Sequence, residues 1–305
     1  MQTILGASGV IGVTLARELK AYTPNIRLVS RNPKKVNDTD LLFTADITNR
    51  QQVFDAVKGS EIVYLVAGLS YKTKVWQEQW PLIMQNVIDA SSEYNCRFVF
   101  FDNIYMIGGD NVKHITENSP FSPTSRKGKV RAQLDRMILD KIEQGKLNAT
   151  IARCADYYGA TGSNSVLMEL VYKNLAKNKR AQWLFNARVR HSFTYVPDAA
   201  KGTAMLGNTK EAYNQIWNLP THGNAMTGED WIRLFANEMR KPDKFTVVPA
   251  WMVSIAGLFV PVMKELYEMR YQFNREYFFD SQKFEKYFGF RATPPDAAVR
   301  EILAT

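Results

Sequence analysis

Three glycines near the start of the sequence have a spacing that serves a recognisable chemistry. They lie in the segment 6–12 (GASGVIG). In a loop that binds a dinucleotide pyrophosphate, the first glycine permits a tight turn, the second lets backbone approach the phosphates, and the third lets a helix pack on a strand. The helix that follows adds unpaired N–H groups and the positive end of its dipole. We expect the whole loop to contact the cofactor: Gly6, Ala7, Ser8, Gly9, Val10, Ile11 and Gly12.

A second determinant of such a site lies about 20 residues beyond the glycine loop. An acidic residue there binds the ribose 2′-hydroxyl of NAD(H), whereas an arginine accommodates the 2′-phosphate of NADP(H). This sequence reads SRNPKK at 30–35, with no carboxylate and three cations. We therefore predict that Arg31 contributes to the site and that the cofactor is NADP(H), with NAD(H) as the alternative. A solvated basic loop is the non-functional interpretation.

The elements that must hold these residues alternate between short β-rich runs and amphipathic segments, which is typical of βαβ units and a parallel sheet. Long helices are expected at 75–94 and 126–143. Right-handed crossovers then produce a doubly wound α/β sheet of the Rossmann type, with its ligand crevice at the carboxyl ends of the strands. The expected strands are 2–5, 26–30, 41–44, 61–66, 97–101 and 148–153.

The regular alternation stops after Gly159. We expect residues 1–159 to form the dinucleotide-binding Rossmann domain, rejoined by a strand near 213–219. Residues 160–305 are expected to form a smaller, mostly helical C-terminal domain that binds the substrate. Helices are predicted there at 166–177 and 228–240, from the spacing of apolar residues.

Several further segments resemble the extended short-chain dehydrogenase/reductase superfamily, the NAD(P)-dependent epimerase/dehydratase-like proteins. They extend over nearly the whole chain and include Asn86 and the segments 153–159 (RCADYYG), 191–200 (HSFTYVPDAA) and 217–220 (WNLP). Asp46-Ile47 and Ala67-Gly68 also match. The resemblance implies that Asp46 and Ile47 contact the adenine and that Ala67 and Gly68 belong to the cofactor site.

The positions where the family carries its catalytic groups differ in this chain. The family has a serine after the fifth strand and a Tyr-x-x-x-Lys pair on the next helix, in which the tyrosine transfers the proton. Here Asn103 or Asp102 falls at the serine position. Lys127 takes the tyrosine position and Arg131 the lysine position, one helical turn apart. Lys127 is predicted to lie beside the nicotinamide ribose and to move a proton or hold an anion.

Additional phenols complete the set of candidate catalytic groups. Tyr105 follows the fifth strand, and Tyr157 and Tyr158 follow the sixth. We include Tyr105 and Asn103 with Lys127 and Arg131 in the predicted catalytic site. A structural role is the alternative for each tyrosine, since tyrosines commonly line such crevices.

Composition narrows the classes of function. Lys and Arg number 39 against 30 Asp and Glu, giving a net charge of +9, but the cations are scattered and no basic arm is present. We therefore expect no nucleic-acid partner. Two cysteines and three histidines without clustering predict no metal site. The uncharged stretch 245–263 is interrupted by prolines, so we interpret it as a buried helix of a cytoplasmic protein without a membrane partner.

Two functions agree with these patterns. The first is an NADP(H)-dependent oxidoreductase or epimerase-like enzyme acting on a small molecule. The second is a non-catalytic NADP(H)-binding redox sensor or regulatory protein. Either allows a homodimer. Aromatic and methionine side chains of the C-terminal part suggest an apolar or aromatic substrate, although they can equally be core: Trp251, Met252, Phe259, Met263, Tyr267, Met269, Tyr271 and Phe273.

Overall fold

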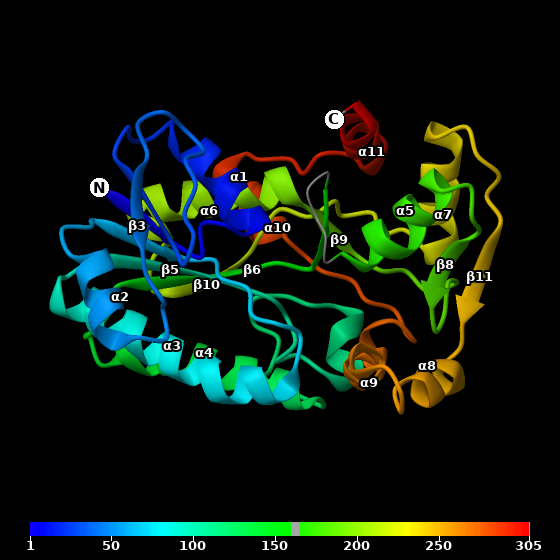
Figure 1. The fold of residues 1–305 in the computed structure, drawn as a ribbon, viewed down its shortest axis with the longest axis horizontal. Helices are drawn as coiled ribbons and strands as arrows, with labels where there is room; N and C mark the ends of the chain where they lie inside the picture. Colours follow the sequence, from blue (N-terminus) through cyan, green and yellow to red (C-terminus); the bar gives the residue numbers. More distant parts are fainter. Residues whose placement is uncertain (160–164, 305) are drawn as a thin grey trace. The chain divides into compact units, whose positions relative to one another are not determined.

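A computed structural model describes residues 1–159 and 165–304 (Figure 1). The chain divides into two compact units. Unit 1 consists of Met1–Met106, Lys127–Cys154 and Ala199–Leu219, and unit 2 of Ile107–Arg126, Ala155–Asp198 and Pro220–Thr305.

The sequence suggests one boundary, between residues 159 and 160, whereas each of the two units contains three separate segments of the chain. Residue 160 lies outside the described part of the chain. Unit 2 also takes Ile107–Arg126, and unit 1 takes back Ala199–Leu219. Most of helix α6 (Val196–Asn208) belongs to unit 1 because Gly207 lies against the ring of Tyr64 in the sheet. The return of the chain to the first unit therefore involves a helix as well as the expected strand.

Unit 1 is built on a seven-stranded sheet in the order β10-β6-β5-β4-β1-β2-β3. Every pairing in it is parallel. The chain begins at β1, moves outward to β3 and then returns to β4 on the other side of β1, so the switch point lies between β1 and β4. The strands are β1 (Gln2–Leu5), β2 (Ile26–Ser30), β3 (Leu41–Thr44), β4 (Ile62–Leu65), β5 (Arg97–Asp102), β6 (Ala149–Arg153) and β10 (Gln215–Asn218).

The doubly wound fold expected from the sequence is confirmed, because helices cover both faces of this sheet. Helices α1 (Val10–Leu19) and α6 lie on one face, and α2 (Arg50–Val57), α3 (Thr73–Glu93) and α4 (Arg126–Glu143) on the other (Figure 1). Apolar side chains of β4 and β5 form a continuous core with those of α3 and α4. Strands buried on both faces explain why their sequences are unbroken apolar runs.

Unit 2 combines helices with two small parallel strand pairs. Strand β8 (Ala181–Leu184) pairs with β11 (Phe245–Val248), and β7 (Asp156–Tyr158) with β9 (Phe193–Tyr195). A π-helical turn (Met168–Tyr172) leads into α5 (Lys173–Ala176). The other helices are α7 (Gly228–Glu238), α8 (Ala250–Ala256), α9 (Pro261–Glu268), α10 (Gln282–Phe288) and α11 (Pro295–Ala304). Its core joins α7, α11 and the strand pairs.

The prediction of a buried helix within 245–263 is wrong. The stretch forms β11 and then two short helices, α8 and α9, with Pro249 capping the first and Pro261 in the first turn of the second. Proline disrupts the interior of a helix but is well suited to its first turn. Pro261 therefore favours two short helices in this stretch over one long helix. Much of the segment is exposed, including Leu258 at 79% and Phe259 at 81%. Among the described residues, no helix is long and apolar enough to cross a bilayer.

Candidate functional site

The loop between β1 and α1 is held in one shape by two of its glycines. Gly6 has φ +93°, and a Cβ there would lie 2.5 Å from the Cα of Ala67. A Cβ on Gly12 would lie 2.7 Å from the Cα of Ala7. At Gly6 the backbone is left-handed and the neighbouring backbone is close, and at Gly12 the neighbouring backbone is close. Glycine, which has no Cβ, satisfies these requirements. The loop therefore turns tightly against β4 and brings α1 directly onto its own backbone.

The remaining glycines leave an open surface at the start of α1. A Cβ on Gly9 would meet nothing closer than 3.5 Å, and one on Gly68 nothing within 4 Å. Gly9 is the N-cap of the ten-residue α1 and supplies no side-chain cap to its N–H groups. A surface without side chains at a helix N-terminus fits a pyrophosphate. The residues present are thus suited to a dinucleotide cofactor.

A cavity of about 360 Å³ adjoins this loop and contains three cationic side chains, Arg17, Lys34 and Lys35. The hydroxyl of Ser8 joins the loop to the end of β2, 2.7 Å from the Ser30 hydroxyl and 3.2 Å from the Asn32 carbonyl oxygen. The cavity is lined by Ala7, Ser8, Val13, Arg17, Asn32, Lys34, Lys35 and Val36.

Arg31, which the sequence pattern singled out, does not line that cavity. It is exposed, and its charge acts instead on Asp46. The pKa of Asp46 lies below its usual value, mainly through hydrogen bonds from the Thr48 N–H and hydroxyl, with a smaller contribution from Arg31. Sequence reasoning missed Arg17, because its distance from the basic segment 30–35 along the chain hides their proximity.

The segment expected to meet the adenine is fixed from behind by a buried amide. Asn86, on α3, donates to the backbone oxygens of Ile47 and Thr48 at 3.2 and 3.1 Å. This accounts for an asparagine on an otherwise apolar helix face. It positions Asp46 and Ile47 at the carboxyl end of β3.

Lys127 is completely buried, at 0% exposure, so it is not a solvated helix cation. Its ammonium donates to the hydroxyl of Thr73 at 3.1 Å and lies 4.4 Å from the ring centroid of Tyr71. The Tyr71 hydroxyl in turn donates to that of Tyr105 at 3.3 Å. The structure therefore joins two predicted residues, Lys127 and Tyr105, through Tyr71, which sequence reasoning missed, as it missed Thr73.

Arg131 is buried one turn further along α4 and forms an ion pair with Asp102, at the end of β5. Its guanidinium also lies 4.6 Å from the ring centroid of Trp80. A second buried pair follows, in which Arg153 donates to Asp135 at 2.9 Å. The regular spacing of Lys127, Arg131 and Asp135 on one helix face is the signal that could have revealed Asp135.

Burial raises the pKa of the Asp102 carboxyl well above its usual range. The charge of Arg131 opposes this shift, while the neighbouring Asp135 carboxyl adds to it. Asp102 Oδ2 and Asp135 Oδ1 are both buried and accept from no donor among the described residues. A proton on Asp102, directed toward Asp135, would satisfy both oxygens.

Asn103 has a structural task that differs from that of the family's serine. Its side-chain oxygen accepts from the Tyr105 N–H at 2.9 Å, and its own N–H donates to Asp102 at 2.7 Å. The turn places the Tyr105 ring parallel to that of Trp76, with 6.0 Å between centroids and 13° between planes. Asn103 thus shapes the loop that presents Tyr105.

The aromatic candidates of unit 2 have their own surroundings. Tyr158 is a core residue, packed against Tyr195 and Trp231 at centroid distances of 5.3 and 5.0 Å, and its burial raises its pKa. His191 is buried beside Asp156 at 2.9 Å and stacks on Tyr277. Tyr157 is partly buried on β7. The described residues hold no group of three or more His, Cys, Asp or Glu suited to a metal ion.

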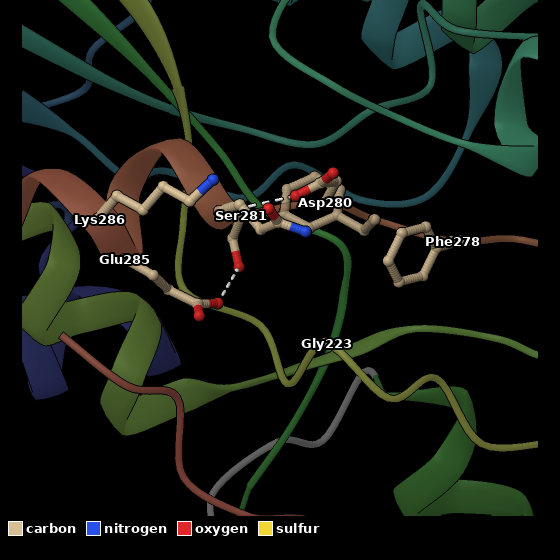
Figure 2. Close-up of a pocket in the computed structure, with 8 residues that line it drawn as sticks. Gly223, Phe278, Asp280, Ser281, Glu285 and Lys286 are labelled. Atoms are coloured by element: carbon tan, nitrogen blue, oxygen red, sulfur yellow. Dashed lines mark hydrogen bonds between the residues drawn. The ribbon is translucent and has the colours of Figure 1, made fainter.

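Unit 2 also contains a cavity of about 350 Å³ beside the start of α10 (Figure 2). Its walls carry both polar and apolar groups: the Ser281 hydroxyl donates to Glu285 at 2.8 Å, and Asp280 lies 2.9 Å from His114. The aromatic and methionine residues behind the expected apolar substrate are absent from this lining. The lining residues are Gly223, Phe278, Phe279, Asp280, Ser281, Gln282, Glu285 and Lys286.

Comparison with known proteins gives a family and a fold. Residues 3–219 match the model of the NAD dependent epimerase/dehydratase family. No curated protein sequence matches the chain. At 15–16% identity, the structural similarities below describe the fold alone.

The UDP-glucose 4-epimerase of Thermus thermophilus, solved in complex with NAD, is similar at 15% identity and a TM-score of 0.79, covering 100% of this chain and 98% of that one. The dTDP-glucose 4,6-dehydratase of Streptomyces venezuelae, with NAD and TYD bound, is similar at 16% identity and a TM-score of 0.80, covering 99% and 96%. The UDP-N-acetylglucosamine 4-epimerase of Bacillus cereus has 16% identity and a TM-score of 0.76, covering 99% and 97%.

Proposed function

Because the chain belongs to the NAD dependent epimerase/dehydratase family, we propose that it is an NADP(H)-binding oxidoreductase or epimerase-like enzyme that uses Lys127 for proton transfer. One observation carries the proposal: the ammonium of Lys127, which the resemblance puts at the family's tyrosine position, is buried and contacts Thr73 and Tyr71. An ammonium is costly to bury, so a fold that retains one there has a use for it.

The residues near the glycine loop support the cofactor assignment. The open backbone at Gly9 and Gly68 leaves room for the pyrophosphate. The cations Arg17, Lys34 and Lys35 suit a 2′-phosphate, and no carboxylate follows β2 to bind a free ribose hydroxyl. When bound, a nicotinamide cofactor supplies the hydride chemistry.

The protein's own groups would then manage the proton. Lys127 Nζ holds it, and the Thr73 hydroxyl accepts from Nζ and is the hydrogen-bonding atom next to it. The ring of Tyr71 covers the ammonium, and its hydroxyl is held by Tyr105. Arg131 is fixed by Asp102 and keeps a positive charge one turn from Lys127. The rings of Tyr71 and Trp80 lie against the two cations.

Two observations bear on the class of substrate. Trp251 and Phe259 are exposed, whereas Phe273 is buried beside His191, so these residues do not form one apolar pocket. Structurally similar proteins include epimerases and dehydratases of sugar nucleotides. We therefore propose to test a panel of candidate substrates that contains both sugar nucleotides and apolar carbonyl compounds. The measurement is the change in the oxidation state of the cofactor.

Lys127→Met is the decisive variant, since methionine keeps an unbranched side chain in the buried space and removes only the ammonium. Turnover should fall by 10²–10⁴-fold, the usual worth of a positioned acid or base, while NADPH affinity stays within about threefold. Lys129→Met, exposed two residues away on the same helix, is the matched control and should leave turnover unchanged. Full turnover in Lys127→Met would remove this residue from the mechanism.

Cofactor preference has a separate test. NADPH should bind at least tenfold more tightly than NADH, a difference of about 1.4 kcal/mol. Lys34→Ala should reduce that ratio several-fold, whereas Arg31→Ala, outside the cavity, should change it much less. Equal affinity of the parent protein for the two cofactors would refute the NADP(H) assignment.

A redox sensor is the second candidate. Two observations favour it: the sequence contains no Tyr-x-x-x-Lys pair, and Arg131, at the position of the lysine, is paired with Asp102. Such a protein would bind NADPH and NADP⁺ with clearly different affinities and turn over no member of the panel. Cofactor-dependent turnover of any member decides for the enzyme.

A further inference from the structure

The most unusual surface of unit 2 is the helical hairpin formed by α8 and α9, here named the apolar hairpin (residues 250–268). Leu258 and Phe259, at its tip, are 79% and 81% exposed, and Trp251 is 64% exposed. Four more large apolar side chains share this exposure: Met252 at 46%, Ile255 at 53%, Val260 at 44% and Val262 at 45%. So dense a group of exposed apolar side chains marks a binding surface rather than ordinary surface variation.

The apolar hairpin is an ordered protrusion and not a loose end. Val253 is buried at 1% and anchors α8. A Cβ on Gly257 would lie 3.1 Å from the Cα of Lys264, so the two helices meet closely at their junction. The exposed side chains are thus presented together, on two helices that brace each other.

Charge is arranged around this surface in a definite way. No charged residue occurs from 245 to 263. On the apolar hairpin itself Lys264 is exposed and its neighbour Glu265 is partly buried, while Lys244 and Asp243 lie before strand β11. Arg270 follows the apolar hairpin and is also exposed. The whole chain carries a net charge of +9. An apolar tip bordered by cations suits a layer that is apolar inside and negative at its surface.

We propose that the apolar hairpin inserts into the interfacial region of an anionic lipid bilayer and holds the protein there as a peripheral protein. Leu258, Phe259 and Trp251 would enter the boundary between head groups and acyl chains, as apolar and aromatic residues of interfacial helices do. Lys264 would reach the lipid phosphates with its ammonium group while its alkyl stem stays with the apolar layer.

A bilayer fits the apolar hairpin better than a second protein copy. Leu258 and Phe259 project almost fully into solvent rather than lining a hollow, and lysines at the border are depleted in protein interfaces. Sequence patterns alone predicted no membrane partner, since a helix buried in the second domain would have hidden these side chains.

Vesicle flotation with the full chain tests the proposal. The parent protein should float with vesicles of phosphatidylcholine containing 30% phosphatidylglycerol, and Leu258→Ser combined with Phe259→Ser should weaken binding at least tenfold. Leu42→Ser combined with Leu82→Ser, which removes two exposed apolar side chains of unit 1 (46% and 48%), is the control and should bind like the parent. Lys264→Gln should weaken binding roughly fivefold, the effect of about one kcal/mol per surface cation.

Tryptophan fluorescence gives an independent readout of insertion. Of the six tryptophans, all in the described part of the chain, Trp251 is 64% exposed, while Trp76, Trp80, Trp183, Trp217 and Trp231 are at most 6% exposed. Lipids brominated along the acyl chain should therefore quench mainly Trp251, and Trp251→Phe should abolish the quenching. Quenching that persists in Trp251→Phe would contradict insertion at this site.

Three results would overturn the proposal: no flotation of the parent protein with anionic vesicles, flotation of the Leu258/Phe259 variant equal to that of the parent, or dimerisation in solution that this variant abolishes without any vesicle binding. The last result would assign the apolar hairpin to contact between copies. Activity is not part of any readout, so the outcome is independent of the proposed function.

Discussion

The protonation of Asp102 gives the sharpest prediction about the site. Asp102 and Asp135 are fully enclosed, and each pairs with one arginine, Arg131 and Arg153. Burial raises the pKa of Asp102. We expect Asp102 to retain a proton at pH values where an exposed aspartic acid is already ionised, and to direct it toward Asp135.

Two substitutions distinguish this state from a fully ionised pair. Asparagine reproduces a protonated aspartic acid, because its amide donates on one side and its oxygen accepts from Arg131 on the other. At pH 4, Asp102→Asn should therefore reduce the free energy of unfolding by only about 1 kcal/mol, close to one altered hydrogen bond. Asp102→Ala leaves the buried Arg131 uncompensated and should cost about 3–5 kcal/mol.

The pH dependence provides a second signature. A carboxyl whose pKa is higher in the folded than in the unfolded chain contributes stability that is present below about pH 4 and is lost as pH rises through the folded pKa. Asp102→Asn removes this group, so its stability deficit relative to the parent should shrink as pH rises above 4, by up to about 1.4 kcal/mol per unit.

Urea denaturation followed by fluorescence at several pH values measures both quantities. Equal losses of about 3 kcal/mol or more in the asparagine and alanine variants at pH 4, or a deficit that grows with pH, would refute the proton on Asp102. Asp102 would then be an ionised partner of Arg131.

Two further predictions concern backbone architecture. Gly12→Ala would place a methyl group 2.7 Å from the Cα of Ala7 and should destabilise the chain by about 1–3 kcal/mol, measured by urea denaturation, whereas Gly68→Ala, with nothing within 4 Å, should not. Thr227 caps α7 in a reciprocal capping box with Asp230, so Thr227→Ala should lower the thermal midpoint by an amount equivalent to about 1 kcal/mol. An unchanged midpoint would show that the box contributes nothing to stability.

The sequence by itself determined the architecture of unit 1. Strands β1, β2, β3 and helix α4 have the predicted bounds, and β10, which lies in the predicted range 213–219, pairs with β6. This was readable because the side-chain period of a strand or helix is a local property, and burial on both faces makes parallel strands continuous apolar runs. The glycine loop was readable for the same reason, since each glycine meets a local backbone demand.

Only the tertiary structure decided which side chains form the site and which surface stays uncovered. The contacts of Lys127 with Tyr71 and Thr73, and the pairing of Asp135 with Arg153, join residues far apart in the sequence. The exposure of residues 250–262 depends on what packs against them, which no local period encodes: the same apolar pattern suits a buried helix or a surface hairpin. Local patterns specify elements, whereas burial and charge pairing depend on the packing of elements onto one another.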